Sequence, residues 1–419
     1  MKILILSHSD ILGGASIAAY RLHRALLNNN INSTMMVRIK KTDDFTVIGP
    51  KGNLEKVLNK IRSPLGGYIN SLSKTCTSGY RSGNWLPSGW VKRINEMDID
   101  IVHIHWVGAE TLSIEDIGKI KKPVIWTLHD MWPFCGTEHY ASDTPKSRWR
   151  NNYIKESLFS CLDLERIVWK RKKRSWSNDI SIVSPSSWLF KCAKDSSLFS
   201  RNHHFLIPNA LDLTVFKPLE KHYCRKILNI DADKKIILFG AIGGVKDERK
   251  GYDLLIKALE LIVKNDNITN IQCLVFGQSI PEQKIDLPVD IKWLGHIHDN
   301  ITLSLMYNAA NVMVVPSRQD NLPQTATEAQ ACGCPVVAFD CTGFPDIIAH
   351  KITGYLAKPY DFVDLARGIS WVIDNRERED NLSKNAVKKA QDNWSEEKVA
   401  SEYIKLYENI LNSKNHNAR

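Results

Sequence analysis

Apolar residues recur along the chain in short buried runs that alternate with amphipathic segments. The run KILILSH at residues 2–8 has the length of a buried strand. It is followed by a turn with two glycines and by IAAYRLHRALLNN, whose apolar residues have helical spacing. Further strand-like runs lie at residues 100–107, 123–130 and 180–186. Repeated strand–helix–strand units predict a parallel sheet covered by helices.

The same alternation begins again after residues 206–218. Helices are predicted from Tyr252, around residues 301–310 and around 325–332, and strands at 235–242, 271–277, 291–297, 310–317 and 334–340. Two sets of such units predict an α/β chain of two doubly wound domains joined at PNALD, which has residues typical of linkers. The last segment has the apolar spacing of an amphipathic helix. The predicted domains are residues 1–212 with a terminal helix at 395–419, and residues 213–394. Residues 50–95 are less regular, and no order of elements is predicted for them.

Composition fits this organisation. A chain of 419 residues is long enough for two domains, and 43% hydrophobic and 24% charged residues are ordinary values for a folded protein. No run approaches the roughly 20 apolar residues of a membrane span, and the opening MKILILSHSD does not resemble a secretion signal, so a cytoplasmic location is expected. The nine cysteines include no C-x-x-C pair, which predicts reduced, buried thiols.

Positive charge is concentrated in the first half. Residues 1–215 contain 30 Lys and Arg against 19 Asp and Glu, whereas the remainder contains 26 against 27. The densest segment is WKRKKRSW at residues 169–176. Three interpretations stay open for it: a solvated helix face, a contact with an anionic membrane surface, or a contact with nucleic acid. Tryptophan beside cations favours a lipid headgroup zone over a duplex.

Candidate chemistry lies where predicted strands end, because ligands of such sheets bind outside the carboxyl ends of the strands and a cleft between two domains is the natural site. Gly13 and Gly14 follow the first strand and could let backbone N–H groups approach an anion. A tight structural turn is the alternative, and the missing G-x-G-x-x-G spacing disfavours a dinucleotide. Arg249 and Lys250 precede a Gly and a helix and could bind phosphate, or could form a solvated basic turn.

Two carboxylates lie in PSRQDNLPQTATEAQACGCPVV, residues 316–337. Asp320 is in the predicted loop and Glu328 near the start of the predicted helix. A carboxylate accepts hydrogen bonds in pairs, so Glu328 could bind the vicinal hydroxyls of a sugar, with Asp320 facing the same ligand. Alternatively, both are surface carboxylates that favour the helix dipole.

The same segment carries a resemblance to a known family. Pro-Ser, a carboxylate, seven residues, Glu-Ala, a small residue and Gly-x-Pro-Val-Val resemble the nucleotide-sugar motif of the family 4 retaining glycosyltransferases, whose GT-B fold has two facing Rossmann-like domains with a cleft and a C-terminal helix that crosses back. GGAS, IPNALDLTVFKP, RKGYDLLIKAL, MYNAANVMVVPS and TGFPDIIAHKITGYLAKPYD match in the family's order and cover nearly the whole chain. TLHDMWPFCGTEHY further resembles bacterial surface-polysaccharide members, including O-antigen enzymes of lipopolysaccharide synthesis.

The resemblance implies roles for single residues. Glu328 would bind the donor ribose, and Asp320 would lie beside the donor sugar. Lys250 would hold the diphosphate, the Gly13–Gly14 turn would approach it from the other domain, and His129 would contact the sugar or the leaving group. Without the resemblance, His129 is a histidine at a strand end, and His105 in DIVHIHWV is interpreted as structural.

Departures from the family pattern limit this transfer. Asp320 stands where the family usually has Glu, and NLPQ replaces Gly-Phe-Gly. Because proline has no N–H, backbone contacts to the donor would have to come from Leu322, Gln324 or Thr325. In addition, Ala241 follows Gly240 where the family often has Arg, and either Arg249 or Lys246 is expected to replace that charge.

The resemblance therefore predicts a retaining hexosyltransferase that uses a UDP- or GDP-sugar. The expected acceptor is a hydroxyl of a polyprenyl-diphosphate-linked oligosaccharide in O-antigen, capsule or exopolysaccharide synthesis, at the inner face of the bacterial inner membrane. No cofactor is expected, and no metal, since no D-x-D pair occurs in a suitable loop. Two alternatives stay open: a nucleotide-sugar epimerase of the same fold, and a nucleic-acid-binding protein that uses residues 169–176, although no nucleic acid is the expected partner.

Overall fold

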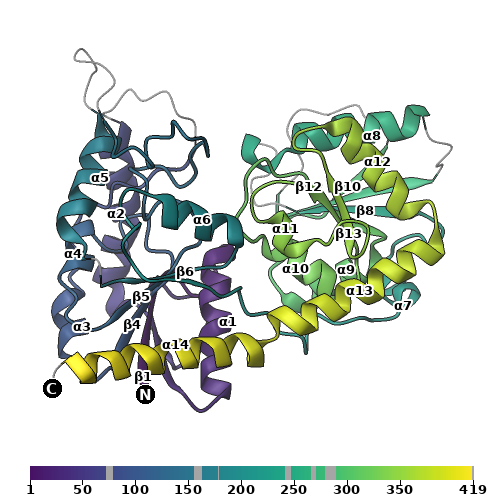
Figure 1. Cartoon of the computed structure of the whole chain (residues 1–419). Coiled ribbons are helices and arrows are strands. Elements are labelled where there is room, and N and C mark those ends of the chain that lie inside the picture. The colour runs from purple at the N-terminus through teal and green to yellow at the C-terminus, as the bar shows by residue number, and fades with distance from the viewer. Residues whose placement is uncertain are drawn as a thin grey trace. The chain divides into compact units, whose positions relative to one another are not determined.

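The chain forms two compact units, each with one sheet (Figure 1). The computed structural model describes residues 1–71, 79–154, 163–177, 179–240, 247–265, 270–278 and 289–417. The first unit consists of residues 1–210 and 397–419, and the second of residues 211–396.

The sheet of the first unit has the strand order β3-β2-β1-β4-β5-β6-β7, and every ladder between these strands is parallel. The order reverses direction between β1 and β4, which is the point of such a sheet where ligands bind. The elements are β1 Lys2–Ser9, α1 Gly14–Asn28, β2 Asn32–Ile39, β3 Val47–Ile48, α2 Gly52–Ser71, α3 Val91–Glu96, β4 Ile101–Ile104, α4 Ile114–Gly118, β5 Val124–Thr127, α5 Leu164–Ser175, β6 Ser181–Ser184, α6 Ser187–Asp195, β7 His204–Leu206 and the terminal helix α14 Glu396–Asn417.

Alternation along β1 explains why its sequence is apolar throughout. Leu4 and Leu6 face one hydrophobic cluster, whereas Ile3 and Ile5 face a second cluster on the opposite side of the sheet. This second cluster contains Tyr403 and other residues of α14. Both faces of the strand are therefore buried, as is usual for parallel sheets, and the last helix of the chain completes the core of the first unit.

The second unit repeats this plan with the strand order β10-β9-β8-β11-β12-β13, again with parallel ladders, and the order reverses between β8 and β11. Its elements are α7 Lys221–Ile227, β8 Lys235–Gly240, the 3-10 turn η1 Glu248–Lys250, α8 Tyr252–Asn265, β9 Ile271–Phe276, β10 Asp290–Trp293, α9 Asn300–Ala309, β11 Val312–Val315, α10 Gln324–Ala331, β12 Val336–Phe339, α11 Phe344–Ile347, β13 Gly354–Ala357, α12 Phe362–Ile373 and α13 Arg376–Trp394.

The predicted fold class is confirmed, with two differences in detail. The strand β2 lies next to β1 although no strand was predicted there, and α2 spans residues for which no element was predicted. The predicted thiols are confirmed for the described chain, in which seven cysteines are free and six of these are buried. Among the described residues, no helix is both long and apolar enough to cross a bilayer.

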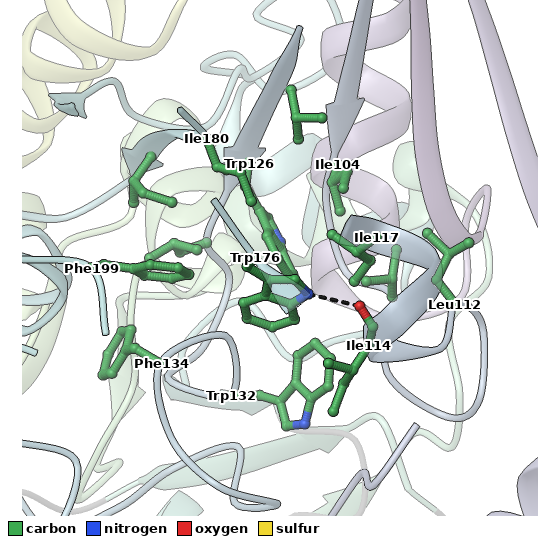
Figure 2. Packing of buried hydrophobic residues seen from close by; sticks show 14 of the residues in the cluster. Ile104, Leu112, Ile114, Ile117, Trp126, Trp132, Phe134, Trp176, Ile180 and Phe199 are labelled. Atoms are coloured by element: carbon green, nitrogen blue, oxygen red, sulfur yellow. Dashed lines mark hydrogen bonds between the residues drawn. The ribbon is translucent and has the colours of Figure 1, made fainter. Parts of the chain in front are cut away.

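The structure does not support the interpretation of the basic segment 169–176 as a surface whose tryptophans face lipid. Trp169 and Trp176 are buried in the core of the first unit, and Trp176 Nε1 donates a hydrogen bond to the Ile114 carbonyl at 2.8 Å (Figure 2). Lys172 is also fully buried. Of the five consecutive cations, Arg171 pairs with Glu115 at 2.7 Å. This part of α5 therefore packs inward, and its tryptophans do not border lipid.

Candidate functional site

The turn before α8 and the loop after β11 lie against each other in the second unit. They follow adjacent strands, β8 and β11, at the carboxyl ends where the strand order reverses. The Arg318 N–H donates to the Arg249 carbonyl at 2.7 Å, and Arg249 Nη1 donates to the Gln319 carbonyl at 2.9 Å. The two segments are thus joined before any ligand binds.

Gly251 allows this close approach. Its φ is 69°, in the left-handed region, and a Cβ at this position would lie 1.9 Å from the Pro316 carbonyl oxygen. Only glycine therefore fits between the turn and the loop, and the glycine fixes where the preceding Lys250 points.

Lys250 and Asp320 form an ion pair across this junction. The distance between Lys250 Nζ and Asp320 Oδ2 is 2.6 Å, and Arg249 Nη1 lies 3.7 Å from the same oxygen. Burial alone raises the pKa of Asp320, which is 7% exposed, but Lys250 and Arg249 outweigh burial and hold the pKa below its ordinary value. The predicted carboxylate and the predicted lysine therefore lie together, and Asp320 is ionised at neutral pH.

Glu328 lies inside α10, where Tyr307 of α9 contacts it. Tyr307 Oη donates a hydrogen bond to Glu328 Oε2 at 2.9 Å, and Glu328 is 4% exposed. The expectation that Glu328 stands near the helix start needs correction, because α10 begins at Gln324 and Glu328 is its fifth residue. The interpretation of Asp320 and Glu328 as surface carboxylates is wrong, since both are buried.

The segment that replaces Gly-Phe-Gly leads into α10. Leu322 is buried in the core of the second unit, Pro323 caps the helix, and Gln324 and Thr325 form its first turn. Backbone N–H groups in the first turn of a helix carry partial positive charge and attract anions. Donor contacts at Leu322, Gln324 and Thr325 stay predictions.

In the first unit, the Gly13–Gly14 turn follows β1 and starts α1. Gly13 has φ 83° and ψ 160°, and nothing lies within 4 Å of the position that its Cβ would take. The buried carboxylate of Asp10 accepts hydrogen bonds from the Lys41 N–H at 2.9 Å and the Thr42 N–H at 2.8 Å, which ties the loop before α1 to the end of β2. The loop before the turn is therefore tied to the segment after β2, and open space lies beside Gly13. Its predicted role toward the donor stays a prediction.

His129 follows β5 and pairs with His105, which follows β4. His105 Nδ1 and His129 Nε2 are 2.9 Å apart. Burial lowers the pKa of His129 to about 4 and lowers the pKa of His105 well below its ordinary value. Both imidazoles are therefore neutral at pH 7. The interpretation of His105 as structural stays a prediction, and the structure adds that its Nδ1 contacts His129 Nε2.

Behind this pair, polar side chains anchor the strands. His103 Nδ1 lies 2.7 Å from Tyr407 Oη, and Thr127 Oγ1 lies 2.8 Å from Tyr403 Oη. Both tyrosines belong to α14, so the terminal helix contacts the two strands that lead to His105 and His129.

A second histidine cluster lies nearby in the sequence. His139 Nδ1 is 2.6 Å from Asp130 Oδ2, and His139 Nε2 is 2.8 Å from Ser82 Oγ. These pairings have the order of a Ser–His–Asp triad. However, Ser82 is buried, and its Oγ also accepts the Ala109 N–H at 3.1 Å. The cluster therefore holds loops together.

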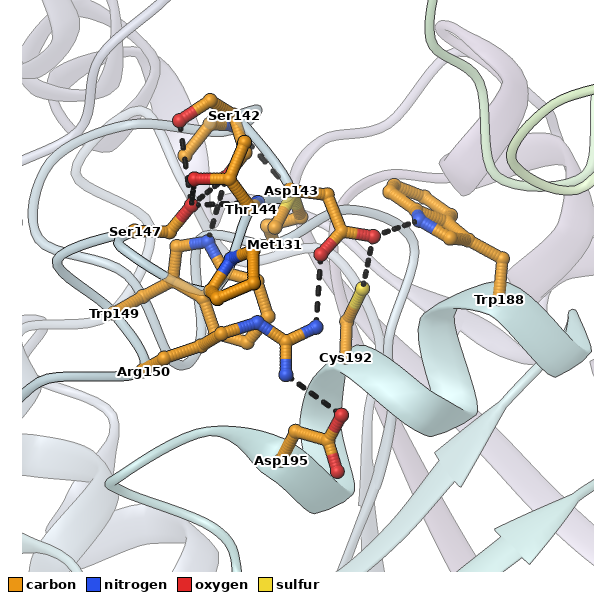
Figure 3. Close-up of polar contacts among 12 residues, drawn as sticks. Met131, Ser142, Asp143, Thr144, Ser147, Trp149, Arg150, Trp188, Cys192 and Asp195 are labelled. Carbon is orange, nitrogen blue, oxygen red and sulfur yellow. Dashed lines mark hydrogen bonds and ion pairs between the residues drawn. The ribbon is translucent and has the colours of Figure 1, made fainter.

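Two further groups of contacts fix the long loop after β5. Lys172 Nζ donates to the carbonyl groups of Cys135 at 3.0 Å and Gly136 at 2.8 Å, and it also donates to the carbonyl of Trp132. Further along the loop, Asp143 accepts hydrogen bonds from Arg150 and from Trp188 of α6 (Figure 3). The loop that carries His129 is thus supported from α5 and α6.

The described residues contain no group of three or more His, Cys, Asp or Glu side chains that could hold a metal ion. The expectation that neither metal nor cofactor is needed stays a prediction. Lys246 and Ala241 lie outside the described residues, so the choice between Arg249 and Lys246 also stays open. A surface pocket of about 330 Å³ is bordered by Lys351 and Arg378. Its lining comes from the segment before β13 and from the α12–α13 region, and it includes neither Lys250 nor Asp320.

Comparison with known proteins agrees with this geometry. Residues 221–389, most of the second unit, match the family model for glycosyl transferases group 1. The second unit therefore belongs to the group 1 glycosyltransferases, and the comparisons support a glycosyltransferase of this kind for the chain. It is 22% identical over 399 residues to the D-inositol 3-phosphate glycosyltransferase of Corynebacterium aurimucosum, covering 90% of this chain and 87% of the relative. It is 27% identical over 201 residues to the capsular polysaccharide biosynthesis glycosyltransferase CapM of Staphylococcus aureus, covering 46% and 50% of the two chains.

Among solved structures, the glycosyltransferase resembles Anabaena Alr3699/HepE in complex with UDP-glucose. The TM-score is 0.65 at 16% sequence identity, with 98% of this chain and 100% of that chain covered. Both units are Rossmann-like, and the fold is GT-B, as the sequence predicts.

Sequence reasoning missed three residues of the glycosyltransferase that shape the candidate site. Tyr307 lies 21 residues before Glu328 on another helix, and nothing near Glu328 in the sequence indicates the contact. Asp10 comes two residues after the predicted strand at 2–8 and precedes the Gly-Gly turn, which is a local signal for a residue that fixes a loop. Gly251 stood next to Lys250 in the sequence, but its close contact with Pro316 depends on the fold.

Proposed function

We propose that this glycosyltransferase transfers a hexose from a UDP- or GDP-sugar to an acceptor hydroxyl with retention at the anomeric carbon. The observation that carries the proposal is the ion pair between Lys250 and Asp320, at the point where the strand order of the second unit reverses and within the segment that matches the family. A lysine ammonium has three donors, of which Asp320 engages one, so others are available to phosphate oxygens.

The chemistry places negative charge on the leaving nucleoside diphosphate. Lys250 and the first turn of α10 would stabilise this charge, because an ammonium group and oriented N–H groups are already in place when it develops. Glu328, oriented by Tyr307, would accept hydrogen bonds from the ribose hydroxyls. Asp320 would face the sugar, and the neutral His129 would donate a hydrogen bond to it.

For retention, the acceptor hydroxyl would attack from the face that the diphosphate leaves. The new carbon–oxygen bond forms as the bond to the diphosphate breaks, and the hydroxyl proton passes to a departing phosphate oxygen. None of these steps requires a cofactor.

The proposed acceptor is a polyprenyl-diphosphate-linked oligosaccharide in the synthesis of a bacterial surface polysaccharide. The similarity to CapM supports this choice, and the likeness to a protein solved with UDP-glucose makes that sugar the first donor to test. O-antigen and exopolysaccharide synthesis are the related possibilities that the same assay covers.

The test is nucleotide release by the purified full chain with a panel of UDP- and GDP-sugars and a lipid extract containing polyprenyl-diphosphate-linked saccharides. We expect release of UDP or GDP together with a labelled product that extracts into organic solvent. Lys250→Gln, which keeps a donor toward Asp320, and Glu328→Gln should each reduce turnover about 100-fold or more. Lys264→Met, which changes an exposed lysine of α8, should have no effect. Wild-type turnover in both site variants would overturn the assignment.

The same assay separates the alternatives. An epimerase of this fold would convert the nucleotide sugar to a second nucleotide sugar without an acceptor, which mass spectrometry detects as a new sugar on an intact nucleotide. A nucleic-acid-binding protein would retain DNA in a salt-dependent manner and would release no nucleotide from any donor.

A further inference from the structure

The helix α2 faces its own unit with polar and small residues. Arg62 donates to the carbonyl groups of Glu110 at 2.9 Å and Leu86 at 2.7 Å. Asn59 donates to the Arg38 carbonyl at 3.1 Å, one turn earlier along the helix. One turn later, Gly66 lies against the Glu110 side chain, and its Cβ would be 2.5 Å from it. These residues follow one another at helical spacing and form the inner face of α2.

The opposite face of α2 is apolar and exposed. Its six large side chains are between 43% and 76% exposed and occur at i, i+3, i+4, i+7, i+11 and i+14: Leu54, Val57, Leu58, Ile61, Leu65 and Tyr68. At 3.6 residues per turn they lie within an arc of about 100° and extend over about 20 Å. We name these six residues the α2 stripe.

This arrangement is the reverse of an ordinary surface helix, which turns its apolar residues toward the core. Apolar area left in water costs about 25 cal/mol per Å² relative to burial. Single exposed apolar residues are common, but a continuous stripe of this kind marks a surface that contacts another apolar phase or molecule. The α2 stripe is therefore an interaction surface.

Charge around the stripe indicates the partner. Lys51, Lys56 and Lys60 are exposed on the same helix or at its start, whereas Glu55 is only partly exposed and its carboxylate accepts the Lys51 N–H. Residues 1–215 as a whole carry an excess of 11 cations. A helix with an apolar face and flanking lysines lies in the plane of an anionic bilayer, with its apolar side chains at the boundary of headgroups and acyl chains.

We propose that the α2 stripe inserts into the surface of an anionic lipid bilayer and that this helix, rather than the basic segment of α5, attaches the first unit to the membrane. Trp169, Trp176 and Lys172 of α5 are buried, which argues against membrane contact through that segment. The α2 stripe has the exposed apolar side chains that a bilayer contact requires. The attachment does not depend on donor binding. Its use in reaching a lipid-linked acceptor rests on the proposed function.

The experiment is flotation of the purified full chain with vesicles of equal parts phosphatidylethanolamine and phosphatidylglycerol, and with vesicles of phosphatidylcholine alone. We expect binding to the anionic vesicles that falls with rising salt. Leu58→Ser/Ile61→Ser should reduce the partition coefficient at least about tenfold, and Lys56→Gln/Lys60→Gln should reduce it by a similar factor on anionic vesicles only.

Matched controls keep the result interpretable. Lys173→Gln/Arg174→Gln removes two exposed cations of α5, and Leu206→Ser removes an exposed apolar side chain of β7. Both should bind as the wild type does, with unchanged thermal melting. Loss of binding in the α5 variant with normal binding of Leu58→Ser/Ile61→Ser would overturn the proposal.

A different occupant would also be detected. If a second copy of the chain covers the α2 stripe, sedimentation should show a dimer, and Leu58→Ser/Ile61→Ser should dissociate it. The wild type should then not bind vesicles. That outcome overturns membrane insertion. Nucleotide release with the same donor panel and with detergent-solubilised acceptor, which requires no vesicle binding, is measured on the same samples. Failure of vesicle binding with normal release concerns this surface alone, whereas failure of release with normal vesicle binding concerns the proposed function alone.

Discussion

Lys250 Nζ lies 2.6 Å from Asp320 Oδ2, so the cation that precedes α8 is held by a buried carboxylate from the loop after β11. Each group orients the other, and each lowers the cost of burying the other's charge. A ligand that attracts Lys250 therefore also acts on the loop that carries Asp320.

This coupling predicts a non-additive pair of substitutions. Lys250→Met removes the cation that pairs with the buried Asp320 carboxylate at 2.6 Å and should lower the free energy of unfolding by about 2–3 kcal/mol. Asp320→Asn in the same background should recover part of this loss, since no buried charge then lacks its partner. A double-mutant cycle by urea unfolding measures the coupling, and additive effects would show that the pair does not interact.

Tyr307 should affect donor binding rather than folding. Tyr307→Phe removes the hydrogen bond to Glu328 and keeps the buried ring, so we expect melting within a few degrees of the wild type. KM for the nucleotide sugar should rise about 3- to 10-fold, corresponding to one lost hydrogen bond, with kcat little changed. An unchanged KM would mean that the orientation of Glu328 does not depend on Tyr307.

Two glycines with positive φ should respond differently to the same change. Gly251→Ala places a Cβ 1.9 Å from the Pro316 carbonyl oxygen and should cost about 2–4 kcal/mol. Gly13→Ala meets open space and should cost only the strain of holding alanine at φ 83° and ψ 160°, about 1–3 kcal/mol. Thermal unfolding of both variants checks this order, and equal losses would contradict the close contact at Gly251.

The neutral pair of His105 and His129 predicts a simple pH profile. Because burial lowers the pKa of His129 to about 4, the rate should show no step near pH 6.5 from this residue. His105→Phe leaves His129 without its neighbour's nitrogen and should lower kcat while moving the chemical shifts of the His129 ring. A rate step near pH 6.5 that disappears in His129→Gln would show that this imidazole titrates where an exposed histidine does.

Lys172 should make stability depend on pH above neutrality. Burial lowers its pKa from 10.5 to about 7 in the folded chain, so between these values the unfolded chain binds more protons. The free energy of unfolding should therefore rise with pH from about 7 to 10.5, by up to about 1.4 kcal/mol per unit. Urea unfolding across this range tests the slope, and Lys172→Met should flatten it. A slope of the same size in this variant would assign it to other groups.

Much of the fold follows from the sequence because parallel strands bury both faces, which leaves continuous apolar runs such as residues 2–8. The strand β2 was not predicted, because it begins with Asn, Ser and Thr and contains Arg38 and so lacks a continuous apolar run. The Arg38 guanidinium is buried because it donates to the carbonyl groups of Ser88 at 2.6 Å and Thr111 at 3.0 Å. These acceptors are distant in the chain, so no local pattern predicts the burial.

The candidate site shows the same limit. Asp320 and Lys250 could be singled out because each stands at a strand end with a chemical type that suits a phosphate or a sugar. Their direct contact could not be predicted, because it depends on how two loops 70 residues apart meet. The inward direction of Lys172 likewise depends on carbonyl groups about 40 residues away, and charge density alone favoured solvent or lipid for that segment.

The packing of α14 on β1 has a consequence for synthesis on the ribosome. The strand β1, which lies between β2 and β4 in the first sheet, is made well before the residues of α14 that pack on one of its faces, among them Tyr403 and Tyr407. Nascent chains that lack α14 leave part of the cluster that contains Ile3 and Ile5 uncovered, and exposed apolar surface of this kind favours aggregation. The first unit is therefore completed only after α14 has been made, so termination near residue 396 should yield an insoluble product instead of a shorter enzyme.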